Sequence, residues 1–348
     1  MGIFHAYDIR GIFGEQLHAE AVYRIGFFLP RLLAADAVLV GRDCRESSPI
    51  LFEALAEGIQ DAGARVDDIG LATTPLVYFL TARHGYRASV CITASHNPAA
   101  YNGLKISTLD SRPVGRESGL ATSRPGWPTN QSCLCRRGAR RSLDGAHEYL
   151  AFVRGFGARF DELRVGVDTG NGMGGLFARA LVGENGVFLS ERLDSSFPDH
   201  GPDPMRAGAL DALRAQVLTR RLDVGVAFDG DADRAVFLDE QGQVVPADLV
   251  LAILARFYLR RGRSGFAIVQ DIRTSRSVAE DLEPRGVTVH TWKVGRAYGA
   301  SRLRELDALI GGELAGHYYF KDFSFSDSAM LAMLMVLDVL AAEKANGA

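Results

Sequence analysis

Three aspartates recur at every second position in the stretch FDGDADRAVF, residues 228–237. Asp229, Asp231 and Asp233 follow an apolar run that is typical of a buried strand. Three carboxylates on one loop repel one another unless a hard cation neutralises them, and Mg²⁺ leaves room for a phosphate oxygen. An EF-hand loop fails as an alternative, since Arg234 stands where that loop needs glycine and its flanks are typical of strands. The pattern favours a Mg²⁺ site over a solvated acidic turn.

A serine and a histidine stand together in CITASHNPAAYNGLKIS, residues 91–107, directly after another apolar run. A loop past the end of a strand occupies the ligand-facing edge of an α/β sheet, where Ser95 could meet a substrate. The plain structural interpretation is a turn built by Asn97 and Pro98, with Ser95 capping a helix. A hydrolase nucleophile is disfavoured, because Ser95 lacks the G-x-S-x-G elbow and His96 is its direct neighbour in sequence.

A third polar cluster lies in GGELAGHYYF, residues 311–320. Glu313 and His317 stand between glycines, which favour a loop that can lie against a ligand. A carboxylate and an imidazole suit hydrogen bonds to sugar hydroxyls, although a simple strand-to-helix turn explains the same residues.

Together the three clusters favour phosphoryl transfer through a phosphoserine. The transferred group carries dispersed negative charge, so catalysis consists mainly of positioning and cationic stabilisation. Mg²⁺ on the aspartates would hold a phosphate oxygen on Ser95. Arg234 and Lys105 could contact the other phosphate oxygens.

The bulk composition is that of a folded protein of several domains. The chain has 348 residues with 47% hydrophobic and 23% charged residues. Its 39 basic and 42 acidic side chains give a net charge of −3, which argues against a dedicated nucleic-acid partner. The N-terminus lacks a signal-peptide pattern, and the apolar stretch 328–342 is expected to form a buried amphipathic helix and not a membrane span. Four cysteines in so long a chain fit a reducing cytoplasm.

Strand-like runs alternate with helical segments, which predicts an α/β protein with parallel or mixed sheets. Ser48 and Thr74, each followed by proline, are expected to cap two helices. We expect three consecutive α/β domains around a central cleft, at residues 1–145, 146–242 and 243–348. Strands are predicted in seven ranges: 37–43, 88–94, 163–168, 222–229, 266–270, 287–290 and 307–313.

Residues 112–141 fit this pattern poorly. They contain seven arginines and one acid, Glu117, and they show neither helical nor strand periodicity. A solvated or disordered loop is the favoured interpretation. A basic nucleic-acid patch and a change of reading frame in the coding DNA are the alternatives.

The chain resembles the α-D-phosphohexomutase superfamily, in particular its bacterial phosphomannomutase/phosphoglucomutase branch. The resemblance covers nearly the whole chain, and TASHNP together with DGDADR is highly specific. The matching stretches are YDIRG (7–11), VGRDCRESS (40–48), TASHNP (93–98), YNGLK (101–105), VDTGNGMGG (167–175), DGDADR (229–234) and GGELAGH (311–317).

The resemblance implies a cytoplasmic enzyme that moves phosphate between O1 and O6 of a hexose through a 1,6-bisphosphate. Its metal ligands would be Ser95, as the phosphoserine, and the three aspartates, Asp229, Asp231 and Asp233. It implies that the transferring phosphate is surrounded by four side chains: Arg10, His96, Lys105 and Arg234. It further implies five residues that bind the substrate or support its pocket: Tyr7, Asn102, Lys293, Glu313 and His317.

Two further departures from the family pattern affect the expected activity. Ala315 replaces a serine in the sugar-binding loop, so one sugar-facing hydroxyl is lost. The chain also stops where family members begin a fourth domain with a phosphate clamp, so we expect a weak mutase or none. A sugar-phosphate-binding or regulatory protein and a phosphatase are the alternative functions. The residues do not distinguish glucose from mannose.

Overall fold

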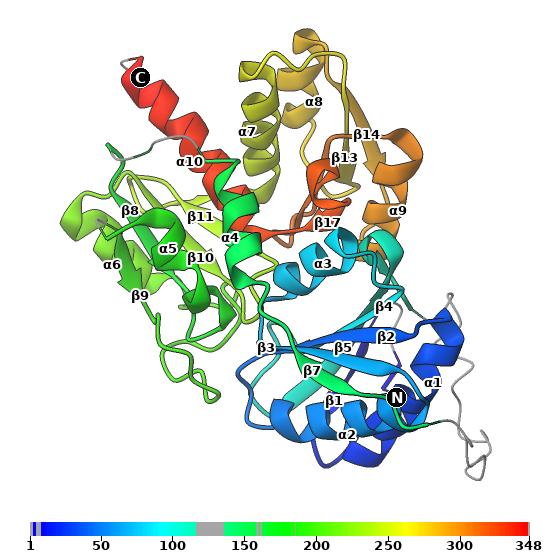
Figure 1. Ribbon diagram of the computed structural model, residues 1–348. Coiled ribbons are helices and arrows are strands. Elements are labelled where there is room, and N and C mark those ends of the chain that lie inside the picture. Colours follow the sequence, from blue (N-terminus) through cyan, green and yellow to red (C-terminus); the bar gives the residue numbers. More distant parts are fainter. Residues whose placement is uncertain are drawn as a thin grey trace. The chain divides into compact units, whose positions relative to one another are not determined.

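The computed structural model describes residues 3–4, 8–115, 136–157, 160, 162–184 and 186–346. The chain forms two compact units (Figure 1). The first holds residues 1–147 together with 194–196, and the second holds residues 148–193 and 197–348. The first unit contains one sheet and the second contains two.

The sheet of the first unit is mixed, in the order β1-β5-β4-β2-β3-β7, with β6 paired to β5. Strands β2, β3, β4 and β7 run parallel, whereas β5 pairs antiparallel with β1, β4 and β6. Because β2 and β4 are parallel neighbours, the loops that follow them leave the same edge of the sheet. The strands are β1 (Ile9–Ile12), β2 (Ala37–Arg42), β3 (Arg65–Leu71), β4 (Ala88–Ile92), β5 (Tyr101–Thr108), β6 (Arg112–Pro113) and β7 (Arg140–Ser142).

Helices cover both faces of this sheet. The helices α1 (Ala19–Leu33) and α2 (Ser48–Asp61) pack together on one face, and α3 (Thr74–Arg83) lies on the other (Figure 1). The central strands β2 and β4 are buried on both faces, so their successive side chains contact the two helical layers in turn. The result is a three-layer α/β/α arrangement.

The two predicted helix caps are each wrong by one residue. The N-cap of α3 is Thr73, whose hydroxyl accepts a hydrogen bond from the backbone N–H of Leu76. Thr74 is the first helical residue, and its hydroxyl donates to Cys91 Sγ. In α2 the Ser48 hydroxyl donates to Asp43 and therefore does not cap the helix.

The second sheet is mixed, in the order β12-β11-β10-β8-β9, and α6 (Asp211–Arg220) packs against β8, β9 and β10. Its strands are β8 (Val165–Asp168), β9 (Val187–Leu189), β10 (Val224–Phe228), β11 (Ala235–Leu238) and β12 (Val244–Val245). Strand β12 pairs with β11 and forms an edge of this sheet. Two shorter helices belong to this part of the chain, α4 (Ala146–Arg154) and α5 (Ala178–Val182).

The third sheet has the order β14-β13-β15-β16-β17. Its strands are β13 (Ala267–Asp271), β14 (Thr288–Trp292), β15 (Ile310–Gly312), β16 (Tyr318–Phe320) and β17 (Ser326–Asp327). Helices α7 (Ala247–Arg260) and α8 (Ser277–Leu282) lie on one face, and α9 (Arg296–Leu306) lies on the other (Figure 1). Single turns of 3₁₀ helix occupy Leu109–Ser111, Met173–Leu176, Glu283–Arg285 and Lys321–Phe323.

The C-terminal helix α10 (Ala329–Ala345) packs against α7 and β11. Its residues from Ala329 to Leu337 are all buried, so its first half is apolar on every side and not amphipathic as expected. None of the described helices combines the length and the apolar character that crossing a bilayer requires.

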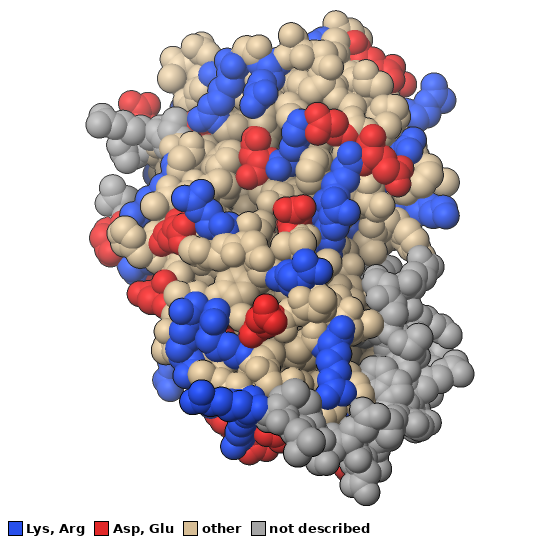
Figure 2. Space-filling view, turned by 45° about the vertical axis from the view of Figure 1, so that its right-hand side comes forward, with Lys and Arg blue, Asp and Glu red and all other residues tan. Residues whose placement is uncertain are grey.

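The predicted α/β class with mixed sheets is confirmed. The arginine-rich segment 112–141 differs from the expected loop at both ends, because β6 and β7 extend the first sheet there. Arg141 of β7 bonds the buried carboxylate of Asp67 with Nε at 2.6 Å from Oδ1. Residues 116–135 lie outside the described residues. On the face drawn in Figure 2, basic and acidic side chains are interspersed over the described surface.

Candidate active site

The Ser95 loop, residues 93–101, begins directly after β4 in the first unit. Ser95 is buried and adopts a left-handed backbone conformation with φ +52°. Its backbone N–H donates to Thr93 Oγ1 at 2.9 Å. The Ser95 hydroxyl oxygen lies 3.4 Å from His96 Nδ1, longer than an ordinary hydroxyl hydrogen bond. The loop leads into β5 and not into a helix, so the alternative in which Ser95 caps a helix is wrong.

Two arginines contact this loop. Arg10 on β1 donates from Nη1 to Asn97 Oδ1 and from Nη2 to Asp8, both at 2.7 Å. Arg45, which follows β2, donates to the backbone carbonyl oxygens of the loop from inside the unit. The first contact places a predicted phosphate-binding residue at the serine loop, and the second involves a residue that the motifs did not single out.

Of the remaining predicted residues in this unit, Lys105 is buried on β5 opposite Cys91. Asn102 was expected among the substrate-binding residues, but it is fully buried. Its amide donates to the hydroxyls of Ser47 at 2.8 Å and Ser48 at 2.9 Å. Asn102 therefore ties β5 to the start of α2. Tyr7 lies outside the described residues.

Strand β5 approaches its neighbours closely at Gly103. A Cβ atom at this position would lie 2.2 Å from the carbonyl oxygen of Ile9 and 2.9 Å from that of Thr93. The glycine in the YNGLK stretch thus lets β1 and the end of β4 come together beside the serine loop.

In the second unit, the acidic loop, residues 229–234, connects β10 to β11 as the sequence predicted. Its three carboxylates are completely buried, and their ligand atoms lie within 4.8 Å of one another. Asp229 Oδ1 accepts the backbone N–H groups of Asp233 and Arg234, each at 3.1 Å. Ala232 completes the tight turn with φ +60°. The donor set consists of oxygen atoms, the ligands that Mg²⁺ and Ca²⁺ prefer.

The glycine-rich stretch 167–175 packs against the backbone of this loop. A Cβ atom on Gly172 would lie 2.7 Å from the carbonyl oxygen of Gly230, so only glycine allows the approach. The N–H of Met173 donates to the same carbonyl at 2.9 Å, and the N–H of Gly230 donates to Pro202 at 3.0 Å. These contacts fix the backbone of the acidic loop independently of its carboxylates.

Arg234 lies beside the buried aspartates, with its Nε 3.9 Å from Asp229 Oδ2. Burial lowers the pKa of Arg234, but the surrounding carboxylates raise it by a larger amount, so the pKa lies above its ordinary value. Three carboxylates this close repel one another, and a bound cation would reduce that repulsion.

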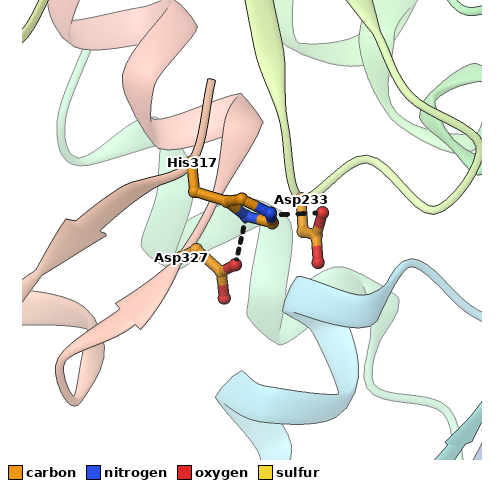
Figure 3. A group of neighbouring side chains, drawn as sticks. All are labelled: Asp233, His317 and Asp327. Atoms are coloured by element: carbon orange, nitrogen blue, oxygen red, sulfur yellow. Dashed lines mark hydrogen bonds and ion pairs between the residues drawn. The ribbon is translucent and has the colours of Figure 1, made fainter. Parts of the chain in front are cut away.

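The sugar-loop histidine is joined to the acidic loop (Figure 3). A β-bridge pairs Arg234 with His317, and the N–H of Ala235 donates to Gly316. Arg234 Nε donates to His317 Nε2 at 2.9 Å, while Nδ1 lies 2.7 Å from Asp327 Oδ2. Because arginine can only donate, Nε2 must be the acceptor, and we assign the ring proton to Nδ1.

Asp233, His317 and Asp327 form a second group whose ligand atoms lie close enough to hold a metal ion. Figure 3 shows the imidazole between the two carboxylates, with Asp233 Oδ1 3.7 Å from Nδ1. Both ring nitrogens already have partners in Arg234 and Asp327. This group is better described as a hydrogen-bonded relay than as a metal centre, so the three aspartates of the loop are the stronger candidate.

Glu313 and Lys293 also belong to the second unit. Glu313 begins the β15–β16 turn, and its Oε1 accepts from the Tyr319 hydroxyl at 2.6 Å. Lys293 is exposed, with its ammonium 5.9 Å from the Trp292 ring centroid and 5.6 Å from that of Tyr298. Glu313 is held rigidly, whereas Lys293 lies at the surface beside two aromatic faces.

Sequence reasoning overlooked Arg45 and Asp327. Arg45 stands in a stretch whose residues were quoted only as a motif, and Asp327 stands between two serines before an apolar helix. The available signal was that each of these charged residues stands next to an apolar strand or helix. A charged side chain in such a place is buried only when it has a partner, so a buried ion pair could have been expected. The partners are distant in sequence, so no local pattern identified them.

Comparison with known families gives three matches that follow one another along the chain. Residues 1–119 match the phosphoglucomutase/phosphomannomutase α/β/α domain I. Residues 147–242 match α/β/α domain II, and residues 246–347 match α/β/α domain III of the same enzymes.

Curated relatives match over almost the whole chain. The phosphomannomutase of Escherichia coli K12 is 32% identical, and the match covers 97% of this chain and 76% of that protein. The phosphomannomutase/phosphoglucomutase of Pseudomonas putida is 33% identical over 97% of this chain and 74% of its own length.

Solved structures show the same arrangement of elements. A phosphoglucomutase/phosphomannomutase family protein from Burkholderia thailandensis superimposes with a TM-score of 0.85 at 31% identity, covering 99% of this chain and 79% of that one. The Aspergillus fumigatus N-acetylphosphoglucosamine mutase, in complex with GlcNAc-6P and magnesium, has a TM-score of 0.59 at 16% identity. That match covers 98% of this chain and 78% of that one, and it shows likeness of fold alone.

Proposed function

The chain belongs to the phosphoglucomutase/phosphomannomutase family and is a phosphohexomutase, and on this premise we propose that it acts through a phosphoserine at Ser95. The proposed reaction interconverts hexose 1-phosphate and hexose 6-phosphate, of mannose, glucose or both. Hexose 1,6-bisphosphate is the intermediate that turns over in the site.

The conformation of Ser95 carries this proposal. The residue holds a strained left-handed conformation at the carboxyl end of β4, with its backbone N–H bonded to Thr93. Strain of this kind persists where the surroundings fix it, and it clusters at functional sites. In the first transfer, the bond between phosphorus and Ser95 Oγ breaks as a sugar hydroxyl oxygen bonds to phosphorus, and the hydroxyl proton ends on Ser95 Oγ. In the second, Ser95 Oγ bonds to the phosphorus at the other end of the bisphosphate, the bond from that phosphorus to the sugar oxygen breaks, and the serine proton passes to this oxygen, which releases the isomeric monophosphate.

We assign the metal to the acidic loop and propose that it is Mg²⁺. Asp229, Asp231 and Asp233 would hold it, together with an oxygen atom on Ser95. When bound, Mg²⁺ supplies positive charge to the oxygens of the transferring phosphate. The burial of the three carboxylates and the close approach of their oxygen atoms support this assignment.

Four side chains are proposed to surround the transferring phosphate: Arg10, His96, Lys105 and Arg234. Arg10 is already fixed at the serine loop by its bond to Asn97. Arg234 carries charge in a buried site, where hydrogen bonds to phosphate oxygens are strong. Their common role is to stabilise the negative charge that spreads over the phosphoryl group.

The sugar is proposed to contact Glu313, His317 and Lys293. Because Tyr319 holds Glu313 and Asp327 holds His317, both polar ends have a defined orientation before a ligand binds. Preorganised hydrogen-bonding groups discriminate between epimers of a sugar better than mobile ones.

Intact-mass analysis of the purified chain tests the proposal. The protein is dephosphorylated, incubated with glucose 1,6-bisphosphate and Mg²⁺, and digested to locate the modification. We expect one phosphate on Ser95, which glucose 1-phosphate or mannose 1-phosphate then removes. Failure to gain phosphate would contradict the mechanism, and release of inorganic phosphate in place of a sugar bisphosphate would identify a phosphatase.

A further inference from the structure

The Arg45 side chain, buried in the first unit, uses each of its five N–H bonds. Its Nε donates to Asp43 Oδ2 at 3.0 Å, and the residue is only 1% exposed. Nη1 and Nη2 donate two bonds each to backbone carbonyl oxygens of the Ser95 loop. The acceptors are Pro98 at 2.7 Å, Tyr101 at 3.1 Å, Ser95 at 2.9 Å and Asn97 at 2.6 Å.

We infer that Arg45, oriented by Asp43, is the positioning residue that keeps Ser95 in the conformation needed for phosphoryl transfer. The inference rests on the proposed role of Ser95 as phosphate carrier. Arg45 acts through the backbone of the loop and does not touch the transferring group.

The strained backbone of Ser95 gives the contact its importance. A serine at φ +52° has a less favourable backbone energy than one in an ordinary strand or helix. Arg45 binds the carbonyl on one side of Ser95, while Thr93 Oγ1 accepts from the N–H on the other. With both peptide groups fixed, the direction of the Cα–Cβ bond of Ser95 is fixed as well.

Only an arginine can make this set of bonds. Four carbonyl oxygens turn toward one cation, and a planar guanidinium presents five donors in fixed directions. A lysine ammonium has three donors at a single point, so it would leave buried carbonyl groups without partners. Lysine at position 45 therefore preserves the charge but not the geometry.

Asp43 makes burial of this cation possible and joins it to the rest of the unit. Its carboxylate accepts the Arg45 backbone N–H at 3.0 Å and the Ser48 hydroxyl at 2.5 Å, in addition to Nε. The Asp43 N–H donates to Ile92, the last residue of β4. The pair is thus neutral overall, and it joins the end of β2, the start of α2 and the serine loop.

Replacement of Arg45 by lysine tests the inference kinetically. Dephosphorylated Arg45→Lys and wild-type protein are mixed with glucose 1,6-bisphosphate and Mg²⁺, quenched at intervals, and analysed by intact mass. We expect the rate constant for phosphorylation of Ser95 to fall about 100-fold, since small misplacements of reacting atoms have effects of this size. The apparent KM for the bisphosphate should change by less than about threefold, because the proposed sugar contacts lie elsewhere.

Arg42→Lys is the matched control. Arg42 lies on β2, is partly exposed, and forms an ion pair at 2.9 Å with Asp68 on β3. We expect this variant to phosphorylate at the wild-type rate. Equal rates for wild type, Arg42→Lys and a folded Arg45→Lys would overturn the inference while leaving the proposed function intact.

Amide hydrogen exchange on the wild-type protein tests the inference without any variant. The N–H of Asn97 donates to Ala94 and that of Tyr101 donates to Pro98, both inside the loop that Arg45 holds. If Arg45 fixes the loop, these two amides should exchange as slowly as those of β4. Exchange at least 100-fold faster than β4 would overturn the inference, even if Arg45→Lys does not fold or Ser95 takes no phosphate.

Discussion

The serine loop and the acidic loop have similar backbones, but the buried charges at their centres have opposite signs. Each follows a buried five-residue strand, β4 or β10, and each contains a non-glycine residue in the left-handed region, Ser95 or Ala232. In the serine loop, backbone carbonyls converge on a buried arginine whose charge Asp43 already balances. In the acidic loop, three carboxylates converge, and the guanidinium of Arg234 lies 3.9 Å from Asp229.

The two loops are therefore preorganised in different ways, one by an internal ion pair and the other by its backbone contacts. The serine loop is held by groups of this chain alone, so its geometry should not depend on bound ions. The acidic loop has a fixed backbone, through Gly172 and Asp229, but it carries three buried carboxylates that repel one another. Its stability should therefore depend on a cation, whereas the stability of the serine loop should not.

The largest expected effect comes from Ser95→Ala. Removal of the hydroxyl eliminates the proposed nucleophile, so mutase activity should fall about 10⁴-fold or more and no phosphate should be gained. Alanine fits the backbone as serine does, so the melting temperature should change little. Coupled assays with glucose 1-phosphate and mannose 1-phosphate provide the measurement. Ser142→Ala, at an exposed position on β7, is the control, and substantial activity in Ser95→Ala would refute the role of Ser95.

Asp231→Asn should remove one negative charge from the acidic loop and leave the two backbone hydrogen bonds to Asp229 in place. Asp229 is unsuitable because its Oδ1 accepts two backbone N–H groups. Loss of one of three mutually repelling buried carboxylates should stabilise the metal-free protein by about 1–2 kcal/mol. The same change should remove most of the stabilisation by Mg²⁺ and lower activity about 100-fold.

Thermal unfolding in EDTA and in MgCl₂ measures both effects. Asp239→Asn is the control, since an asparagine oxygen can still accept the N–H groups of Gln241 and Gln243 in that turn. A wild-type melting temperature that does not respond to Mg²⁺ would show that the buried charge is balanced in another way.

Asp327→Asn should have an intermediate effect. The aspartate accepts from Arg296 Nε at 3.1 Å and from His317 Nδ1, so it holds the imidazole with Nε2 toward Arg234. An asparagine amide can donate to Nδ1 and shift the ring proton to Nε2, where it would oppose the Arg234 N–H. We expect kcat to fall about 10–100-fold.

The ¹⁵N chemical shifts of His317 report the tautomer directly. Asp322→Asn, which alters a carboxylate bonded to the Tyr258 hydroxyl in the same unit, should leave these shifts unchanged. Identical shifts in Asp327→Asn and wild type would show that Asp327 does not determine the tautomer.

The smallest expected effect is a pH dependence from His200. Its Nε2 lies 3.1 Å from Asp168 Oδ1, and this hydrogen bond raises the pKa of His200 above its ordinary value. A raised folded-state pKa gives stability that is fully present below the unfolded pKa of about 6.5 and is lost as pH rises through the folded value.

The melting temperature of wild type relative to His200→Asn should therefore be about 1–2 °C higher at pH 5.5 than at pH 8.5. His147→Asn, at an exposed position, provides the comparison for general effects of pH. An advantage of wild type that grows with pH would contradict the assigned direction of the shift.

Much of the fold could be predicted because strands and helices follow local patterns. The apolar runs before Ser95 and before Asp229 are strands, and proline near the start of α2 and α3 marks both helices. The caps were wrong by one residue because hydroxyl partners depend on tertiary neighbours. Ser48 bonds Asp43, and Thr74 bonds a thiol on β4.

The sequence by itself determined which residue types stand on which loops, since short motifs and strand periodicity are properties of neighbouring residues. Only the tertiary structure decided which distant residues support those loops. Arg45 reaches Ser95 because β2 and β4 are parallel neighbours whose carboxyl ends meet at one sheet edge. His317 meets Arg234 and Asp327 because a β-bridge and the β15–β17 meander bring three separate segments together. Such contacts depend on strand order and packing, which no local pattern encodes.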